Sequence, residues 1–118
     1  MVQNKIAIDV RKPNPRMAVL DIKGDVTNQA EAALMDAYNK ACDSGAKSVA
    51  LNFTGLEYMN SSGIGLLVTM LIRAQRNGQK LLAYGLTDHY RQIFELTQLN
   101  KAIRICSDEA NALASADL

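Results

Sequence analysis

Hydrophobic and polar positions alternate in the first part of the chain with the period of two that is typical of half-buried β-strands. Residues 6–10 show this alternation, and residues 18–23 show it again after the segment Pro13-Asn14-Pro15. Proline has no backbone N–H to donate, so a continuous ladder is excluded at this segment. Because the connection is short, we expect two antiparallel strands.

The spacing of apolar residues then changes to the period of an α-helix. From Ala30 to Cys42 apolar residues recur every three or four positions, and this stripe stops before Gly45. Asn28 and Glu31 lie three positions apart, which predicts a variant of the capping box at the start of the helix.

A second amphipathic helix is expected from about Ser61 to Asn77, because Gly78 follows as a stop signal. One apolar stripe of this helix is expected to face the sheet: Ile64, Leu67, Val68, Leu71 and Ile72. Leu66, Met70 and Arg73 are expected on the outer side. They would either bind a partner or pack under a neighbouring helix.

The remaining segments continue the alternation of strands and helices. Residues 49–53 form an apolar strand, and Lys80–Tyr84 contains the unbroken apolar run of a central strand that is covered on both faces. A helix from Asp88 to about Gln98, a short strand near residues 102–105 and a helix from Ser107 follow. We therefore predict one α/β domain over residues 1–118. It has a mixed sheet of about five strands, antiparallel at its start and then parallel, and about four helices.

Composition and charge restrict the possible partners. With 118 residues, of which 48% are hydrophobic, and a formal net charge of +1, the chain can build its own core. No Lys/Arg cluster exceeds the pair Arg11-Lys12, so a nucleic-acid surface is not expected. No apolar run reaches membrane-spanning length and no signal sequence is recognisable, so we expect a cytoplasmic protein without a membrane partner.

Residues that commonly carry catalysis or bind metals are few and scattered. His89 is the only histidine, and its place beside Asp88 at a helix start favours a solvated or capping role. Cys42 and Cys106 are too few and too scattered for a disulfide framework or a zinc site, and the carboxylates form no paired motif. We expect no catalytic residue, no metal and no cofactor, and the protein is not predicted to be an enzyme.

Candidate chemistry is concentrated in Asn60-Ser61-Ser62-Gly63-Ile64-Gly65, where a strand leads to the second long helix. A phosphate on a hydroxyl at this place would be stabilised by unpaired backbone N–H groups and by the positive end of the helix dipole. Serine is also a common N-cap, and from the residues alone capping is the more frequent role. The two glycines lack the further residues of a nucleotide-binding loop, so they support nucleotide binding only weakly.

The same segment resembles the signature of the STAS family, which includes the anti-sigma factor antagonists. In that family a strand leads through a loop to Asp-Ser-Ser/Ala-Gly-apolar-Gly at the head of a helix, and Asn60–Gly65 matches this pattern. Further similarity lies at Gly24-Asp25, at Arg76-Asn77-Gly78 and from Ile93 to Leu99. The resemblance implies the small STAS architecture over nearly the whole chain.

The resemblance also implies regulation by partner switching. An unmodified antagonist binds an anti-sigma factor that is also a serine kinase, and so frees the sigma factor. Phosphorylation by this kinase breaks the complex, and a metal-dependent serine phosphatase restores it. Ser61 occupies the position of the phosphorylated residue, and Ser62 that of a cap or spacer. The partner surface is expected to comprise Gly24, Asp25, Thr27, Asn60, Ser61, Ser62, Gly63, Leu66, Met70 and Arg73.

Asn60 departs from the family pattern, because phosphorylatable members usually carry aspartate there. Asparagine keeps the cap geometry but lacks the charge, and this difference either slows phosphoryl transfer or relieves repulsion of the phosphate. We expect the slower transfer to dominate. The alternatives are a non-phosphorylated STAS scaffold in a signalling or transporter-associated complex and, with less support, a small nucleotide-binding domain.

Overall fold

The computed structural model describes residues 6–116. Its elements follow the predicted order, with two short 3₁₀ turns (η1 and η2) in addition. They are β1 (Ile6–Asn14), β2 (Met17–Val26), η1 (Asn28–Ala30), α1 (Glu31–Asp43), β3 (Ser48–Met59), α2 (Ser61–Arg76), β4 (Lys80–Tyr84), α3 (Asp88–Leu96), η2 (Leu99–Lys101), β5 (Arg104–Cys106) and α4 (Glu109–Ala116).

The strands form one mixed sheet in the order β1-β2-β3-β4-β5. β1 and β2 are antiparallel, while the pairs from β2 to β5 are parallel. The register places Leu20 beside Leu51 and Leu51 beside Ala83, so apolar side chains line up across the central strands. The predicted fold class is therefore confirmed.

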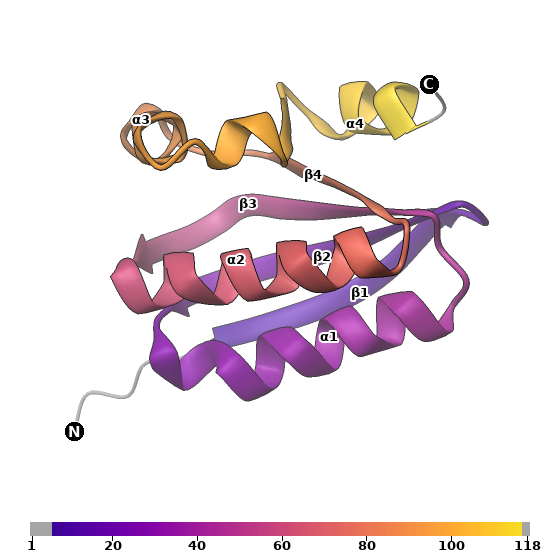
Figure 1. Ribbon diagram of the computed structural model, residues 1–118, viewed down its shortest axis with the longest axis horizontal. Coiled ribbons are helices and arrows are strands. Elements are labelled where there is room, and N and C mark those ends of the chain that lie inside the picture. Colours follow the sequence, from indigo (N-terminus) through magenta and orange to yellow (C-terminus); the bar gives the residue numbers. More distant parts are fainter. Residues whose placement is uncertain (1–5, 117–118) are drawn as a thin grey trace.

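Both faces of the central sheet are covered, as Figure 1 shows for α1 and α2 on one side and α4 on the other. The larger core lies under α1 and α2, and it also takes up Phe94 from α3. The smaller core includes Met17, Val19 and Ala112 beneath α4. Val19 lies on the opposite face of β2 from Ala18 and Leu20, and it is fully buried because α4 covers it.

β3 is longer than its apolar pattern indicates. It continues beyond Phe53 to Met59, where a short loop was expected, because it keeps pairing with the last residues of β2. Two register shifts accommodate the additional residues, between Asp21 and Lys23 and between Gly24 and Asp25. Such bulges bend and twist a strand without ending its pairing. As a result, only Asn60 separates the strand from α2.

The caps and the buried side of α2 also differ from expectation. Thr27, not Asn28, caps the turn before α1, because its hydroxyl accepts from the backbone N–H of Gln29 at 3.2 Å. On α2, Val68 and Ile72 are 38% and 46% exposed, so they do not belong to the sheet-facing stripe. The buried residues of α2 are Gly63, Leu67, Met70 and Ala74.

No helix within residues 6–116 combines the length and the apolar character needed to span a bilayer.

Candidate functional site

Asn60 forms the junction between β3 and α2. It has an extended backbone conformation, and its side-chain oxygen Oδ1 accepts a hydrogen bond from the Gly63 N–H at 3.0 Å. Its carbonyl oxygen accepts from the Ile64 N–H at 3.0 Å, which begins the helical ladder. Asn60 is therefore the N-cap of α2, and it takes the role that the sequence left available to either serine.

Gly63 allows the start of α2 to approach the end of β2. A Cβ atom at this position would lie 2.1 Å from the Val26 carbonyl oxygen and 2.9 Å from the Met59 side chain. Both distances are too short for any side chain, so glycine is required here by packing. Gly65 differs, because a Cβ added there would meet nothing within 4 Å.

Ser61 and Ser62 are both exposed at the first two positions of α2. Among residues 6–116 neither hydroxyl takes part in a hydrogen bond. Because Asn60 supplies the cap, the hydroxyl of Ser61 is not needed for the fold. It is accessible to an incoming reactant beside the positive end of the helix dipole.

The end of β2 lies against the same junction. Val26 pairs with Met59, and its carbonyl oxygen accepts from the Asn60 N–H at 3.4 Å. Gly24 has a left-handed backbone conformation with φ of 101°, and Asp25 pairs with Tyr58. The structure thus brings the predicted partner residues Gly24 and Asp25 at the end of β2, and Thr27 directly after it, next to the signature turn.

Tyr90 of α3 supports this junction from a distant part of the sequence. Its hydroxyl oxygen accepts a hydrogen bond from the Met59 N–H at 2.9 Å. This contact joins residues 31 positions apart, and no motif in the sequence predicts it. Tyr58 is a second residue that sequence reasoning missed, since this residue is 51% exposed at the end of β3.

The predicted outer side of α2 is wrong for Met70, whose side chain is completely buried in the core. Leu66 is partly buried against the same core. Arg73 is engaged with α1: its guanidinium donates to Asn39 Oδ1 at 2.9 Å and lies 5.5 Å from the ring centroid of Tyr38. These three residues therefore pack within the fold.

A different stripe of α2 faces solvent. Ser61, Gly65, Val68 and Ile72 are exposed and follow one another at intervals of four, three and four residues. This spacing places them on one side of a helix. The exposed Ser61 hydroxyl therefore lies on the same side of α2 as the exposed apolar side chains of Val68 and Ile72.

Charged groups with shifted pKa values lie elsewhere, on the sheet face that carries α4. The Arg11 guanidinium donates to Asp21 Oδ2 at 2.5 Å and to Glu109 Oε1 at 2.7 Å. Hydrogen bonds from Arg11 lower the pKa of the Asp21 and Glu109 carboxyls. The Tyr84 hydroxyl donates to Glu109 at 2.7 Å. The pKa of this phenol is raised, and burial is the main cause. This network fastens α4 to the sheet.

Within residues 6–116, no three His, Cys, Asp or Glu side chains lie together in a way that could hold a metal ion. Cys42 and Cys106 are free thiols, and each is partly buried.

Comparison with known proteins agrees with the sequence signature. The sequence model of the family described as "Mlab, STAS domain" matches residues 11–106. The chain belongs to the STAS domain family. This match covers most of the chain and includes β2, β3 and α2, which form the candidate site. The predicted family is confirmed.

Individual STAS proteins with related sequences or folds are anti-sigma factor antagonists. The anti-sigma-B factor antagonist of Staphylococcus aureus is 30% identical over 61 residues. The match covers 52% of this chain and 56% of that relative, so it spans little more than half of either.

Two solved structures show the same fold over nearly their full lengths. An anti-sigma factor antagonist from Mycobacterium paratuberculosis has a TM-score of 0.79 at 18% identity, covering 99% of this chain and 98% of that one. The phosphorylated form of the Bacillus cell fate determinant SpoIIAA has a TM-score of 0.71 at 18% identity, covering 92% and 98%. At such identities the likeness establishes the architecture.

Proposed function

We propose that this STAS protein is an anti-sigma factor antagonist that acts by partner switching through Ser61. The observation that carries the proposal is the free, exposed Ser61 hydroxyl at the first position of α2, where Asn60 already supplies the cap. The partners are an anti-sigma factor with serine kinase activity and a metal-dependent serine phosphatase, and the protein acts in the cytoplasm. It is the substrate of both enzymes and carries no catalytic residue of its own.

A phosphate on Ser61 would change the surface more than the fold. A phosphoserine carries a charge of about −1.5 to −2 at neutral pH and has strong acceptor oxygens. At the start of α2 this charge is favoured by the helix dipole. A partner surface that fits a neutral hydroxyl would lose complementarity, because a desolvated phosphate without matching donors opposes binding.

We propose a partner surface around the signature turn. It retains Gly24, Asp25, Thr27, Asn60, Ser61, Ser62 and Gly63. Gly24, Thr27 and Gly63 are buried, so they support the shape of this surface and do not present side chains on it. Val68 and Ile72 extend the surface along α2, replacing the buried Met70 and the engaged Arg73. Gly65 leaves room between Ser61 and these two side chains.

Phosphate transfer is tested with the cognate anti-sigma factor kinase and ATP. Intact mass should increase by one phosphate, the increase should be lost in Ser61→Ala, and it should persist in the matched control Ser62→Ala. Peptide mapping that placed the phosphate on Ser62, or no phosphate with a kinase shown to be active, would refute the assignment.

Partner binding is tested separately by calorimetry with the unphosphorylated protein. Ile72→Glu should weaken the complex at least tenfold, because it introduces a charge into the proposed apolar contact. Lys40→Glu on α1 is the control, since Lys40 is exposed on another helix. The affinity of this variant for the partner should stay within about twofold of the affinity of the parent protein. Equal affinities for Ile72→Glu and the parent protein would remove the outer stripe of α2 from the site.

A further inference from the structure

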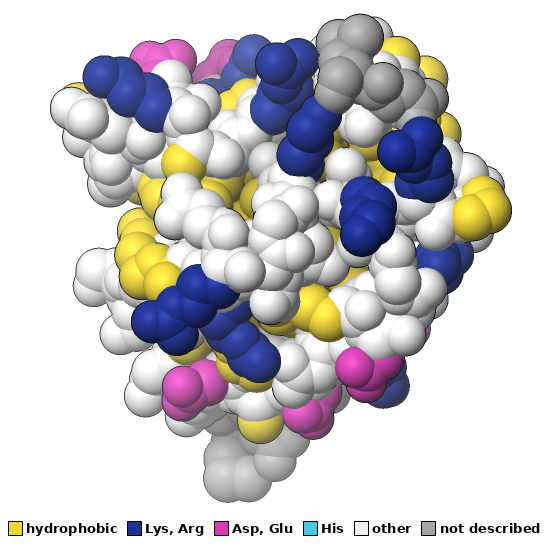
Figure 2. Space-filling view, turned by 45° about the vertical axis from the view of Figure 1, so that its right-hand side comes forward, with side chains coloured by type: hydrophobic (Ala, Val, Ile, Leu, Met, Phe, Trp, Pro, Cys, Tyr) yellow, Lys and Arg dark blue, Asp and Glu magenta, His cyan; other side chains and the backbone are white. Residues whose placement is uncertain are grey.

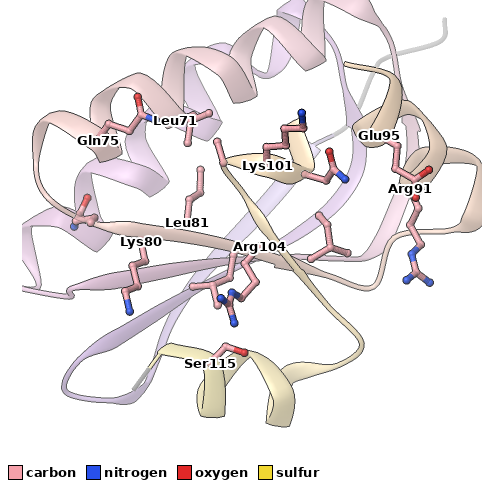
Figure 3. A pocket seen from close by; sticks show the side chains of 14 residues that line it. Leu71, Gln75, Lys80, Leu81, Arg91, Glu95, Lys101, Arg104 and Ser115 are labelled. Carbon is pink, nitrogen blue, oxygen red and sulfur yellow. The ribbon is translucent and has the colours of Figure 1, made fainter. Parts of the chain in front are cut away.

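A concave region separate from the signature turn lies beside β4, near the start of β5. It is a cleft of about 800 Å³ bordered by α2, β4, α3, η2, β5 and α4 (Figure 3). β5 pairs only with residues 82–84 of β4. The preceding residues Lys80 and Leu81 therefore border the cleft at an edge of the sheet that β5 leaves uncovered.

Positive charge gathers around this cleft, although the chain as a whole is nearly neutral. Within residues 6–116, the lining of the cleft contains one carboxylate, that of Glu95. It also contains four cationic side chains from four different elements: Lys80, Arg91, Lys101 and Arg104. On the face shown in Figure 2, Lys and Arg side chains are spread over much of the surface, whereas Asp and Glu side chains lie along its upper and lower edges. The local excess of cations favours an anionic ligand.

Three of the four cationic side chains are unpaired in the described part of the chain. Within residues 6–116, the side chains of Arg91, Lys101 and Arg104 make no hydrogen bond or ion pair. Arg11 and Arg73, in contrast, are held by partners within the protein. The unpaired donors at the cleft are therefore available to a ligand.

The cations are not evenly spaced. In Figure 3, Arg91 lies beside Glu95 at one end of the cleft, the side chain of Arg104 points toward Ser115, and the side chain of Lys101 points the other way. The carboxylate of Glu95 offsets the charge of Arg91 at its own end. Arg104 and Lys101 therefore line the cleft away from its one carboxylate.

Apolar side chains form the other part of the lining. Leu71 of α2, Leu81 of β4 and Ile105 of β5 border the cleft together with the amides of Gln75 and Asn100. The lining thus combines apolar side chains with polar and charged ones, and the volume of the cleft is within the range of sites for small organic ligands.

We propose that this cleft binds a small phosphate monoester with a compact apolar body. The phosphate would be held by Arg104, since a guanidinium can bind phosphate through two parallel hydrogen bonds, and the Lys101 ammonium would add to the positive potential of the cleft. The apolar body would lie against Leu71, Leu81 and Ile105. The site is separate from Ser61, and the proposal does not depend on the partner switch.

Three probes separate the contributions of charge and apolar contact. 1-Naphthyl phosphate carries both features, 1-naphthoate carries the same ring with a smaller charge, and inorganic phosphate carries the charge without the ring. In titrations followed by ¹H–¹⁵N NMR at low salt, naphthyl phosphate should bind saturably and at least tenfold more tightly than either other probe. The shifted amides should include those of Leu81, Lys101 and Ile105.

Paired variants locate the site. The double variant Lys101→Gln/Arg104→Gln should weaken naphthyl phosphate binding at least tenfold. The control Lys40→Gln/Lys47→Gln removes the same charge from exposed positions outside the cleft and should change the affinity less than twofold. Unchanged binding in the cleft variant, equal affinity for the three probes, or shifts scattered over the surface would overturn the proposal. Binding of a hexaglutamate peptide but not of naphthyl phosphate would also overturn it, in favour of an acidic protein segment.

Discussion

Gly63 and Gly65 belong to one short motif, yet their surroundings differ. Gly63 faces the Val26 carbonyl oxygen at the end of β2, whereas the space beside Gly65 is empty. A glycine in a helix costs stability relative to alanine unless packing requires it. The first glycine is therefore explained by the fold, and the second lies in the exposed stripe that we assign to the partner.

Alanine substitution should separate these two roles. Gly63→Ala should lower the free energy of unfolding by about 2 kcal/mol or more, because its methyl group collides with backbone that cannot move freely. Gly65→Ala should leave stability unchanged or raise it by up to about 1 kcal/mol. Urea unfolding followed by circular dichroism measures both values. Equal destabilisation by the two changes would contradict the different packing of the glycines.

Asn60 combines a structural role with a chemical one. Aspartate can also accept from the Gly63 N–H, so Asn60→Asp should keep the cap and the fold. If a carboxylate beside the acceptor promotes phosphoryl transfer, this variant should be phosphorylated faster than the parent protein. The measurement is the initial rate with one kinase at saturating ATP. An equal or lower rate would show that asparagine does not attenuate the switch.

At the scale of elements, α2 has two apolar sides. Eight of its sixteen residues are apolar, and the buried side includes Gly63, which has no side chain, and Ala74, whose small side chain allows close packing. Val68 and Ile72 then remain on the exposed side. Because both stripes are apolar, the helical period alone could not assign the inner one.

Truncation should distinguish the two sides of α2. Met70→Ala should cost about 2–5 kcal/mol of folding free energy, since it leaves a cavity in the core. Ile72→Ala should change stability by about 0.5 kcal/mol or less, because the side chain is 46% exposed. Chemical denaturation of both variants provides the comparison. A large loss in Ile72→Ala together with a small loss in Met70→Ala would reverse our orientation of the helix.

α4 is fastened to the sheet by Arg11, whose guanidinium binds Asp21 and Glu109. The pKa values of both carboxyls are lowered in the folded protein, mainly by hydrogen bonds from Arg11. A group with a lowered pKa stabilises the fold above its unfolded pKa, and this contribution is lost as pH falls through the folded pKa. The ion pairs should therefore stabilise the protein at neutral pH and lose their effect in acid.

Arg11→Gln should reveal this pH dependence. The variant should be less stable than the parent by about 1 kcal/mol at pH 7, a small value because the Arg11 side chain is 42% exposed and screened by solvent. The difference should shrink as pH falls below about 4, where the carboxyls become protonated. Arg16→Gln, at an exposed cation outside the network, is the control. A difference that did not change with pH would argue against ion pairing as its cause.

At the scale of the whole molecule, the proposed switch acts at the surface of a fold that stays intact. Ser61 is exposed at the start of α2, and the core residues that support this helix lie on its opposite side. Phosphorylation should therefore leave the circular dichroism spectrum unchanged and should not lower the thermal midpoint. A helix N-terminus favours negative charge by about 0.3–1 kcal/mol, so a slight increase is expected. A large loss of stability would point to regulation by unfolding.

Local patterns in the sequence were sufficient for the identity and order of the main elements. Alternation identified β1 and β2, helical spacing identified α1 and α2, and the signature placed Ser61 at a helix start. These features depend on residues close together in the chain, where periodicity and turn chemistry act. The family followed from the same short segment.

Only the assembled fold decided the features that depend on distant contacts. Pairing with β2 extended β3 to Met59, α4 buried Val19, and the hydroxyl of Tyr90 reached the Met59 N–H. Packing chose which apolar side of α2 faces the core, and the end of β5 left the cationic cleft uncovered. The physical reason is the same in each case: strand register, burial and cleft formation depend on which surfaces meet, and a local pattern contains no information about the surface opposite.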